Sequence, residues 1–166
     1  MRSIVLIAHN LRSTHNVGSL LRTAEGLGVE AVWLTGYTPY PNLHKLDQRL
    51  PYIAEKLDKQ IAKTALGAER QITWHHSPDV FDVISELKSF GYVIVGLEQH
   101  KKSVSLPAYK PAERLALIVG REVEGMEPEV QQACDELIEI PMFGAKESYN
   151  VVQAAAMALY HLRFTN

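Results

Sequence analysis

One segment near the start of the chain combines residue types that could bind a charged ligand. It contains Asn16 and Arg22, with Gly18 between them. A guanidinium such as that of Arg22 can hold a phosphate through two parallel hydrogen bonds. Asn16 is well placed to cap a helix, and Gly18 would let a ligand come near the backbone. The same residues also fit a plain helix cap and an ordinary surface ion pair, so this segment alone decides nothing.

A second candidate segment is the turn from Gly120 to Gly125, which contains Glu122. It differs from the dinucleotide-binding pattern Gly-x-Gly-x-x-Gly, because its middle position is Glu122. The glycines permit a sharp turn and a close approach of the backbone to another group. Glu122 could orient Arg22 through an ion pair or hydrogen-bond a polar ligand, and the alternative is a tight turn in solvent.

The third candidate segment begins with Ile140, Pro141 and Met142 and continues to Ser148, Tyr149 and Asn150. A proline and a glycine-containing loop precede a pair of polar residues at the start of a helical pattern. Either Ser148 or Asn150 could be a simple N-cap rather than a binding residue.

Apolar runs that alternate with helical patterns must position these three segments. Several of the runs are continuously apolar, which is typical of strands buried on both faces of a parallel sheet. The alternation predicts an α/β fold. The expected strands are 4–8, 31–34, 92–97, 115–119 and 136–140, with 71–74 as a weaker sixth, and the expected helices are 17–27, 50–65, 78–90, 128–134 and 148–164; segments 36–43 and 101–113 are expected loops.

Each of the three polar segments follows a strand of this predicted sheet. Ligands of open α/β sheets collect at the carboxyl ends of the strands. We therefore expect the three loops to meet at one edge and to form a single pocket.

The last predicted helix is apolar on nearly all sides. Val151, Ala155 and Leu159 belong to one stripe, while Met157 and Tyr160 belong to the opposite side. A helix of this kind is buried on more than one side. In so small a domain the second side could pack against another subunit; the alternative is an ordinary core helix with a few exposed alanines.

Length and composition favour a single globular domain of residues 1–166, since domains commonly contain about 100–200 residues. The one cysteine, Cys134, cannot form an internal disulfide and has no neighbours at zinc-ligand spacing. This favours a reducing cytoplasm. No signal peptide and no membrane span are expected, because no apolar run approaches about 20 residues.

The net charge of −2 does not by itself indicate nucleic-acid binding. The charge is unevenly distributed, however: residues 1–70 carry 9 Lys and Arg against 6 Asp and Glu, and residues 71–166 carry 8 against 13. Such asymmetry can hide a local basic face. The segment 36–69 is long and leans basic.

Several chemistries lack their sequence patterns. His75 and His76 are adjacent and so share no face for a metal ion, and we expect no metal site. The chain has neither the Gly-x-Ser-x-Gly elbow of serine hydrolases nor the phosphate loop of nucleotide triphosphatases.

The three segments closely resemble the three signature motifs of the TrmH (SpoU) family of the SPOUT class. The matches are Asn16-x5-Arg22-Thr-Ala, Gly120-x-Glu122-x-x-Gly125, and Ile140-Pro-Met followed by Ser148-x-Asn150-Val and an alanine-rich helix. They occur in the family's order, and the resemblance covers nearly the whole chain. It implies an S-adenosylmethionine-dependent methyltransferase that acts on a ribose 2'-hydroxyl of tRNA or rRNA.

The resemblance also implies a Rossmann-like parallel sheet with a C-terminal deep trefoil knot, an exception to the rule that chains do not thread loops. It implies a homodimer through the C-terminal helix, in agreement with the apolar pattern found there. S-adenosylmethionine would be held mainly by backbone groups at Leu97, Gly120, Ile140, Met142 and Tyr149.

By the same resemblance, Arg22 would be the central catalytic group. An arginine stays protonated, so we expect Arg22 to stabilise the developing oxyanion rather than to act as a base. Asn16 would hold the ribose and orient Arg22, Glu122 would hold Arg22 or a neighbour in the partner subunit, and Ser148 and Asn150 would position the RNA.

Two departures from the family stand out. Many relatives carry an RNA-binding extension that we do not expect here, and Tyr149 stands where leucine or methionine is commoner. The rival hypotheses are a non-catalytic knotted module that binds RNA, and a doubly wound nucleotide-binding enzyme. The second would need a glycine-rich loop where this chain has residues 10–16.

Overall fold

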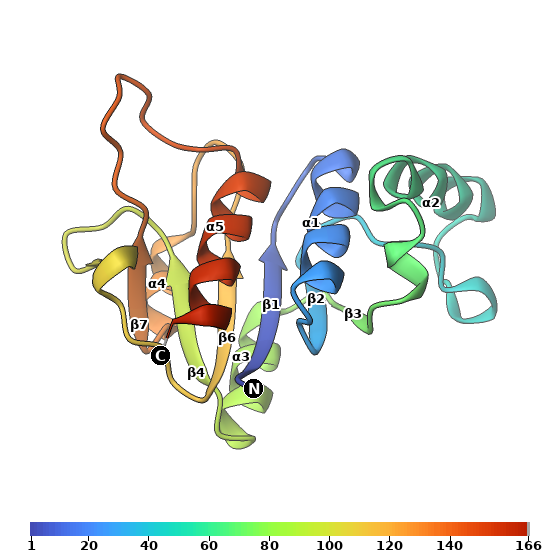
Figure 1. The fold of residues 1–166 in the computed structure, drawn as a ribbon. Coiled ribbons are helices and arrows are strands. Elements are labelled where there is room, and N and C mark those ends of the chain that lie inside the picture. The colour runs from blue at the N-terminus through green and yellow to red at the C-terminus, as the bar shows by residue number, and fades with distance from the viewer. Residues whose placement is uncertain (166) are drawn as a thin grey trace.

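The computed structural model describes residues 1–165, which form seven strands and five α-helices (Figure 1). The strands are β1 (Ser3–His9), β2 (Ala31–Thr35), β3 (Trp74–Ser77), β4 (Val93–Leu97), β5 (Val104–Ser105), β6 (Arg114–Val119) and β7 (Glu136–Glu139). The helices are α1 (Thr14–Gly26), α2 (Pro51–Ala65), α3 (Val80–Ser89), α4 (Pro128–Ala133) and α5 (Val151–Phe164). Short 3₁₀ turns lie at His44–Leu46, Ala68–Arg70 and Leu106–Ala108.

The seven strands form one sheet in the order β3-β2-β1-β6-β4-β7-β5, and every neighbouring pair is parallel. This confirms the predicted α/β fold. The central strands β1, β6 and β4 are the most apolar, because both of their faces are covered.

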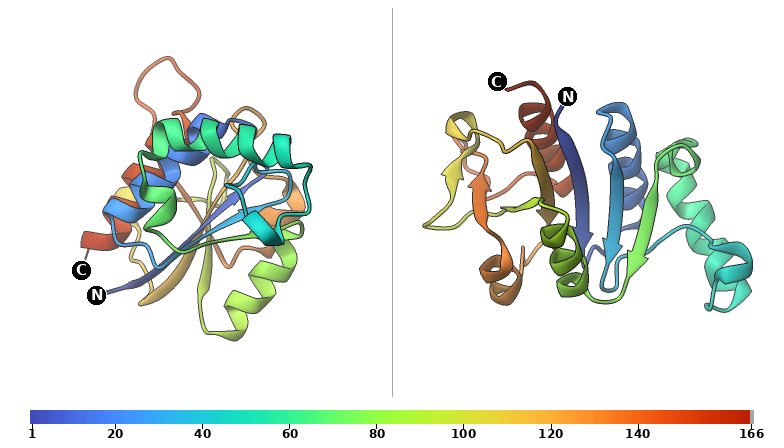
Figure 2. Two further views of the ribbon diagram at one scale, coloured as in Figure 1. Left: turned by 90° about the vertical axis from the view of Figure 1, so that its right-hand side faces the viewer. Right: turned by 90° about the horizontal axis from the view of Figure 1, so that it is seen from below.

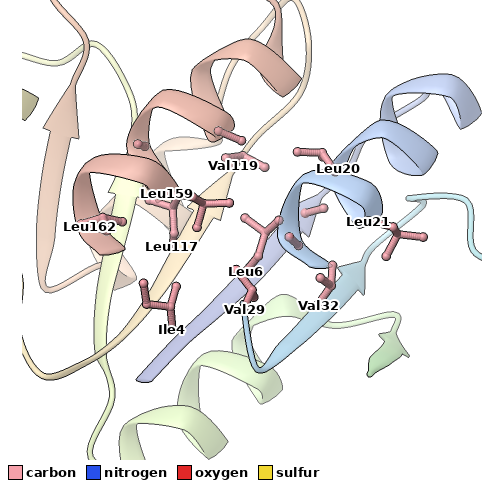
Figure 3. Close-up of a cluster of buried hydrophobic side chains, with 14 of the residues drawn as sticks. Ile4, Leu6, Leu20, Leu21, Val29, Val32, Leu117, Val119, Leu159 and Leu162 are labelled. Atoms are coloured by element: carbon pink, nitrogen blue, oxygen red, sulfur yellow. The ribbon is translucent and has the colours of Figure 1, made fainter. Parts of the chain in front are cut away.

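Helices cover both faces of the sheet (Figures 1 and 2). Successive side chains of β1 point to opposite faces of the sheet and therefore pack alternately into the two cores that flank it. Ile4 and Leu6 belong to the core beneath α1 and α5, which also contains Leu20 and Leu159 (Figure 3). Val5 belongs to the second core, beneath α3 and α4.

The two edge strands were the least well predicted. The strand predicted at 71–74 was placed three residues too early, since β3 begins at Trp74 and contains His75 and His76. An edge strand is partly exposed and so tolerates polar residues, which interrupt the apolar pattern by which a strand is predicted. Strand β5 lies inside the segment expected to be a loop and pairs with β7 through only two residues.

Two helix starts differ from the prediction. The N-cap of α1 is Ser13, whose hydroxyl accepts the N–H of Asn16 at 3.1 Å, so the assignment of Asn16 as N-cap was wrong. Helix α5 begins later than expected because the Asn150 side chain accepts the N–H of Val152 at 2.9 Å. Asn150 is therefore a true N-cap.

Helix α2 packs directly on α1 at Gly18. A Cβ atom placed on Gly18 would lie 2.2 Å from the carbonyl oxygen of Ile61 and 2.2 Å from the hydroxyl of Thr64. The Thr64 hydroxyl also donates to the carbonyl oxygen of His15 at 2.8 Å. Gly18 thus admits a neighbouring helix and not a ligand, which corrects the sequence-based interpretation of this glycine.

The two ends of the described chain are joined at the amino edge of the sheet (Figures 1 and 2). The Arg2 guanidinium donates to the carbonyl oxygens of Leu162 and Thr165 at 2.7 and 2.8 Å. In the opposite direction, the Arg163 guanidinium donates to the carbonyl oxygen of Leu27 at 2.9 Å. These bonds hold the end of α5 against the start of β1 and the end of α1.

Across residues 1–165, we find no helix with the length and apolar character needed to cross a bilayer.

Candidate functional site

A hollow of about 270 Å³ lies at the carboxyl edge of the sheet, where β4, β6 and β7 end. Its lining comes from the ends of these strands, the turn after β6 and the loop that leads to α5. Six residues singled out from the sequence line it: Leu97, Gly120, Glu122, Ile140, Ser148 and Tyr149. The structure therefore brings the second and third sequence segments together at one edge.

The turn after β6 folds back tightly on itself. A Cβ on Gly120 would lie 2.8 Å from the backbone nitrogen of Met126, so only glycine fits there without displacement. Gly125 has a φ of 71°, in the left-handed region that favours glycine. The Glu98 carboxylate accepts the N–H of Met126 at 2.7 Å and fixes this turn to the end of β4.

Sequence reasoning missed Glu98. Its signal was available, since a charged residue directly follows a buried strand at the carboxyl edge of the sheet.

Glu122 connects the same turn to the start of α1. Its carboxylate accepts the N–H of Ser13 at 3.0 Å, the N–H of Arg12 at 3.2 Å and the side-chain amide of Asn16 at 3.3 Å. Burial alone would raise the pKa of Glu122, but these donors and its own N–H outweigh burial and lower the pKa. Glu122 therefore stays ionised near the positive end of a helix.

Asn16 stands between the second and third segments. Besides donating to Glu122, it accepts a hydrogen bond at 3.4 Å from the side-chain amide of Asn150, the N-cap of α5. One chain of contacts thus joins all three sequence segments, although neither asparagine lines the hollow itself.

Arg22 lies outside the hollow of its own chain. It is exposed on α1, beside Ser19, Thr23 and Thr64. Among the ion pairs formed within residues 1–165, none involves Arg22, so the expected Glu122–Arg22 pair is wrong within one chain. Met142 does not line the hollow either.

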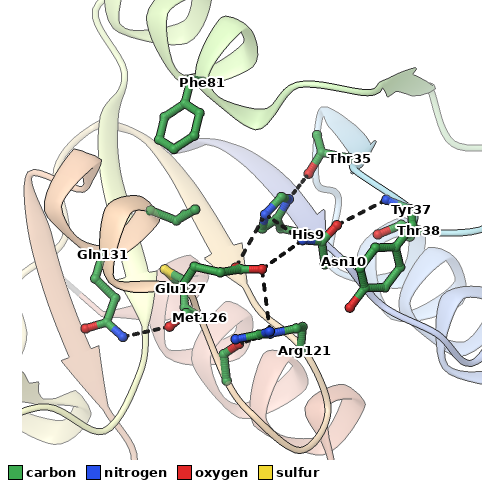
Figure 4. A network of polar contacts seen from close by, with 12 residues as sticks. His9, Asn10, Thr35, Tyr37, Thr38, Phe81, Arg121, Met126, Glu127 and Gln131 are labelled. Carbon is green, nitrogen blue, oxygen red and sulfur yellow. Dashed lines mark hydrogen bonds and ion pairs between the residues drawn. The ribbon is translucent and has the colours of Figure 1, made fainter.

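A polar network behind the hollow links the ends of β1 and β2 to the turn after β6 (Figure 4). Its centre is Glu127, whose carboxylate accepts the Asn10 amide at 2.8 Å and lies 3.6 Å from Arg121 and 3.5 Å from His9. The His9 ring also contacts the hydroxyl of Thr35 at 2.9 Å.

Burial lowers the pKa of His9 and outweighs the opposing attraction of the Glu127 carboxylate. The network therefore contains a neutral imidazole near pH 7, and we regard it as a support that fixes the backbone on either side of the turn.

The lining of the hollow is acidic. The charged residues of the lining are Arg121 and five glutamates, Glu98, Glu122, Glu124, Glu139 and Glu147. Opposite charges attract strongly where solvent is partly excluded. The hollow therefore suits a ligand that carries a positive charge. Within residues 1–165, no three His, Cys, Asp or Glu side chains gather in a group able to hold a metal ion.

Comparison with known proteins gives a family match. The model of the SpoU rRNA Methylase family matches residues 3–160. A 23S rRNA (guanosine-2'-O-)-methyltransferase RlmB of Neisseria meningitidis is 30% identical over 165 residues, and a Staphylococcus saprophyticus protein named for the TrmH family of tRNA/rRNA methyltransferases is 32% identical over 160 residues. Each alignment covers 96% of this chain and 58% of the relative, so this chain spans little more than half their length.

The fold also matches solved structures. The AdoMet-bound rRNA methyltransferase of Sinorhizobium meliloti superposes with a TM-score of 0.80 at 19% identity, covering 98% of this chain and 57% of that one.

Proposed function

Because this chain belongs to the SpoU rRNA methylase family, we propose that it transfers a methyl group from S-adenosylmethionine to a ribose 2'-hydroxyl of tRNA or rRNA. The observation that carries the proposal is the acidic hollow lined by the second and third motifs, to which Asn16 of the first motif is joined by hydrogen bonds with Glu122 and Asn150. We propose that residues 1–166 act as one catalytic domain in the cytoplasm. The C-terminal trefoil knot implied by the family resemblance stays a prediction.

The residues of the hollow fit the cofactor. S-adenosylmethionine, when bound, supplies an activated methyl group on a positively charged sulfur. The five glutamates of the lining favour that charge, and Gly120 holds the turn after β6 close against the end of its strand at the hollow. We assign backbone contacts to Leu97, Gly120, Ile140 and Tyr149. We also keep Met142, which is the third residue after the end of β7 and lies in the same loop.

Asn16, Ser148 and Asn150 would bind the RNA beside the cofactor. Asn16 is held in place by Glu122 and Asn150, so its position depends on both other motifs. We assign Glu122 the role of fixing Asn16 and the start of α1. Ser148 lines the hollow at the end nearest α5.

We propose that Arg22 stabilises the negative charge that develops on the ribose oxygen while the hydroxyl proton passes to a substrate phosphate or to solvent. Since it lies outside its own hollow, we infer that it serves the hollow of a partner subunit in a homodimer. The exposed side of α5 supports this arrangement, because it presents Met157, Tyr160 and Phe164, with the two aromatic rings 4.8 Å apart. An exposed apolar stripe of this kind favours a contact with another chain.

Two inactive variants test the assignment when they are mixed. Arg22→Ala removes the guanidinium but keeps the hollow, and Gly120→Ala perturbs the hollow but keeps Arg22. If Arg22 acts across the dimer, mixed dimers regain methyl transfer from labelled S-adenosylmethionine to RNA that lacks the modification. If mixing restores nothing although both variants fold and dimerise, the assignment across the dimer is wrong.

The proposal as a whole is tested by mapping 2'-O-methyl groups in total RNA from cells with and without the gene. Loss of at least one methylated position is expected. The rival function, a non-catalytic RNA-binding module, predicts identical maps and no heat of binding when S-adenosylmethionine is titrated into the protein.

A further inference from the structure

The outer face of helix α2 carries a row of lysines. Lys56, Lys59 and Lys63 are exposed, at spacings of three and four residues that place them on one side of a helix. Tyr52 continues the row at the start of the helix and is 68% exposed. Glu55 is the only exposed acidic residue on this side, because Asp58 is half-buried and accepts the N–H of Asn42 at 2.9 Å.

The charges of these lysines are not neutralised by the chain itself. Within residues 1–165, no ion pair includes Lys56, Lys59 or Lys63. Nearby Arg49 provides the contrast, since it is half-buried, pairs with Asp47 and donates to the carbonyl oxygens of Tyr40 and Pro41 at 2.9 and 3.0 Å. Arg49 holds a loop together, whereas the three lysines are free to bind a partner.

The lysine row continues to Arg22. Helix α2 is pressed against α1 at Gly18, and Thr64 borders both Arg22 and the contact between the helices. Lys63 directly precedes Thr64 in the chain. The basic band, Lys63, Lys59 and Lys56, therefore begins one residue from the surface that Thr64 shares with Arg22, and ends at the exposed ring of Tyr52.

The band contrasts with the acidic hollow, in a chain whose net charge is −2. From Lys56 to Lys63 the helix rises by about 10 Å. A row of that length can contact successive phosphates of one nucleic-acid strand. An exposed tyrosine at the end of such a row provides a surface on which a base can stack.

We propose that the outer face of α2 binds the phosphate backbone of the substrate RNA beside the methylated nucleotide. The inference rests on the proposed function and names the surface that holds the strand while its ribose meets Arg22. The lysines contact phosphates and set the position of the strand, without reading its sequence.

The main test replaces three charges. The variant Lys56→Gln/Lys59→Gln/Lys63→Gln is compared with Lys101→Gln/Lys102→Gln/Lys110→Gln, a control that removes the same charge from exposed lysines near the opposite edge of the sheet. Wild type and both variants of residues 1–166 are titrated with a fluorescent, mixed-sequence 20-nucleotide RNA at several salt concentrations. We expect the α2 variant to raise the Kd about tenfold or more and to reduce the slope of log K against log salt by about 2.

The control variant should change the Kd by less than about threefold. Tyr52→Ala should weaken RNA binding about fivefold or more, while Tyr52→Phe should retain it, because stacking needs the ring and not the hydroxyl. Equal losses in the α2 variant and the control, or an unchanged salt slope, would overturn the assignment.

Binding of S-adenosylmethionine and methyl transfer separate this proposal from the function on which it rests. If the wild-type protein methylates RNA and the α2 variant binds RNA with unchanged affinity, the assignment of the α2 surface is refuted but the proposed function is not. Wild type that binds no RNA at all refutes both. An α2 variant that loses affinity for an acidic protein in a pull-down while its RNA affinity stays the same would reassign the surface to a protein partner.

Discussion

The close contact of α1 and α2 at Gly18 can be tested by adding a single methyl group. In Gly18→Ala, the new Cβ would lie 2.2 Å from the Ile61 carbonyl oxygen and 2.2 Å from the Thr64 hydroxyl. Ordinary contacts between heavy atoms are about 3.5 Å, so the helices must separate by about 1 Å. The Thr64 side chain could rotate away, but the Ile61 carbonyl belongs to the backbone of α2.

The expected cost follows from three contributions. Overpacking costs about 1–3 kcal/mol, and loss of the hydrogen bond from Thr64 to His15 costs about 1 kcal/mol. Alanine is favoured over glycine within a helix by about 1 kcal/mol, which offsets part of this. We expect the free energy of unfolding to fall by about 2 kcal/mol and the Tm to fall by roughly 4–8 °C.

A matched control exists in the same helix. Gly26 is exposed, and a Cβ there would meet no atom within 4 Å. Gly26→Ala should therefore leave stability unchanged or raise it by up to about 1 kcal/mol. Both variants are measured by urea denaturation and calorimetry. If Gly18→Ala proves as stable as Gly26→Ala, then α2 does not lie where we describe it, and the basic band beside Arg22 loses its basis.

Three further predictions concern ionisable groups. Glu122→Gln should lower the free energy of unfolding by about 1–3 kcal/mol at pH 7. The folded pKa of Glu122 lies below its unfolded value of 4.5, so its contribution to stability is present above pH 4.5 and is lost as the pH falls through the folded pKa. Urea denaturation should therefore show a smaller difference between wild type and variant at pH 3 than at pH 7. Burial raises the pKa of the Cys134 thiol to about 12. Iodoacetamide should therefore modify this thiol slowly in the native protein at pH 8 and quickly in urea. Equal rates of modification would contradict its burial. An NMR titration of His9 should give a midpoint below 6.5, because burial lowers its pKa, and a midpoint at or above 6.5 would refute the neutral imidazole in the network.

The elements of the fold with strong patterns were predictable from the sequence. Buried strands such as β1 and β6 are continuously apolar, and α2 ends as predicted at Ala65. The edge strands carry weaker signals: β3 is polar because it is half exposed, and β5 has only two residues. Their positions depend on pairing with distant residues, and a local pattern does not contain that information.

In the candidate site, too, features set by a local pattern were predictable and features set by distant partners were not. Glycine spacing correctly predicted the tight turn at Gly120, because the Met126 backbone lies where a Cβ of residue 120 would be. The partners of charged groups were not predictable: Glu122 holds the N–H groups of residues 12 and 13 rather than Arg22. Gly18 was misinterpreted because a sequence does not reveal whether a ligand or a helix occupies the space beside it.

The bonds made by Arg2 and Arg163 place both ends of the described chain on the amino side of the sheet, while the hollow opens at the carboxyl side. A linker or an affinity tag attached at either end would therefore leave the protein at nearly the same place, on the amino side of the sheet. The height of β1, seven residues of about 3.3 Å each, separates that point from the hollow. Protein anchored to a sensor chip by either terminus should thus present its hollow outward, and the two orientations of attachment should give the same affinity for S-adenosylmethionine.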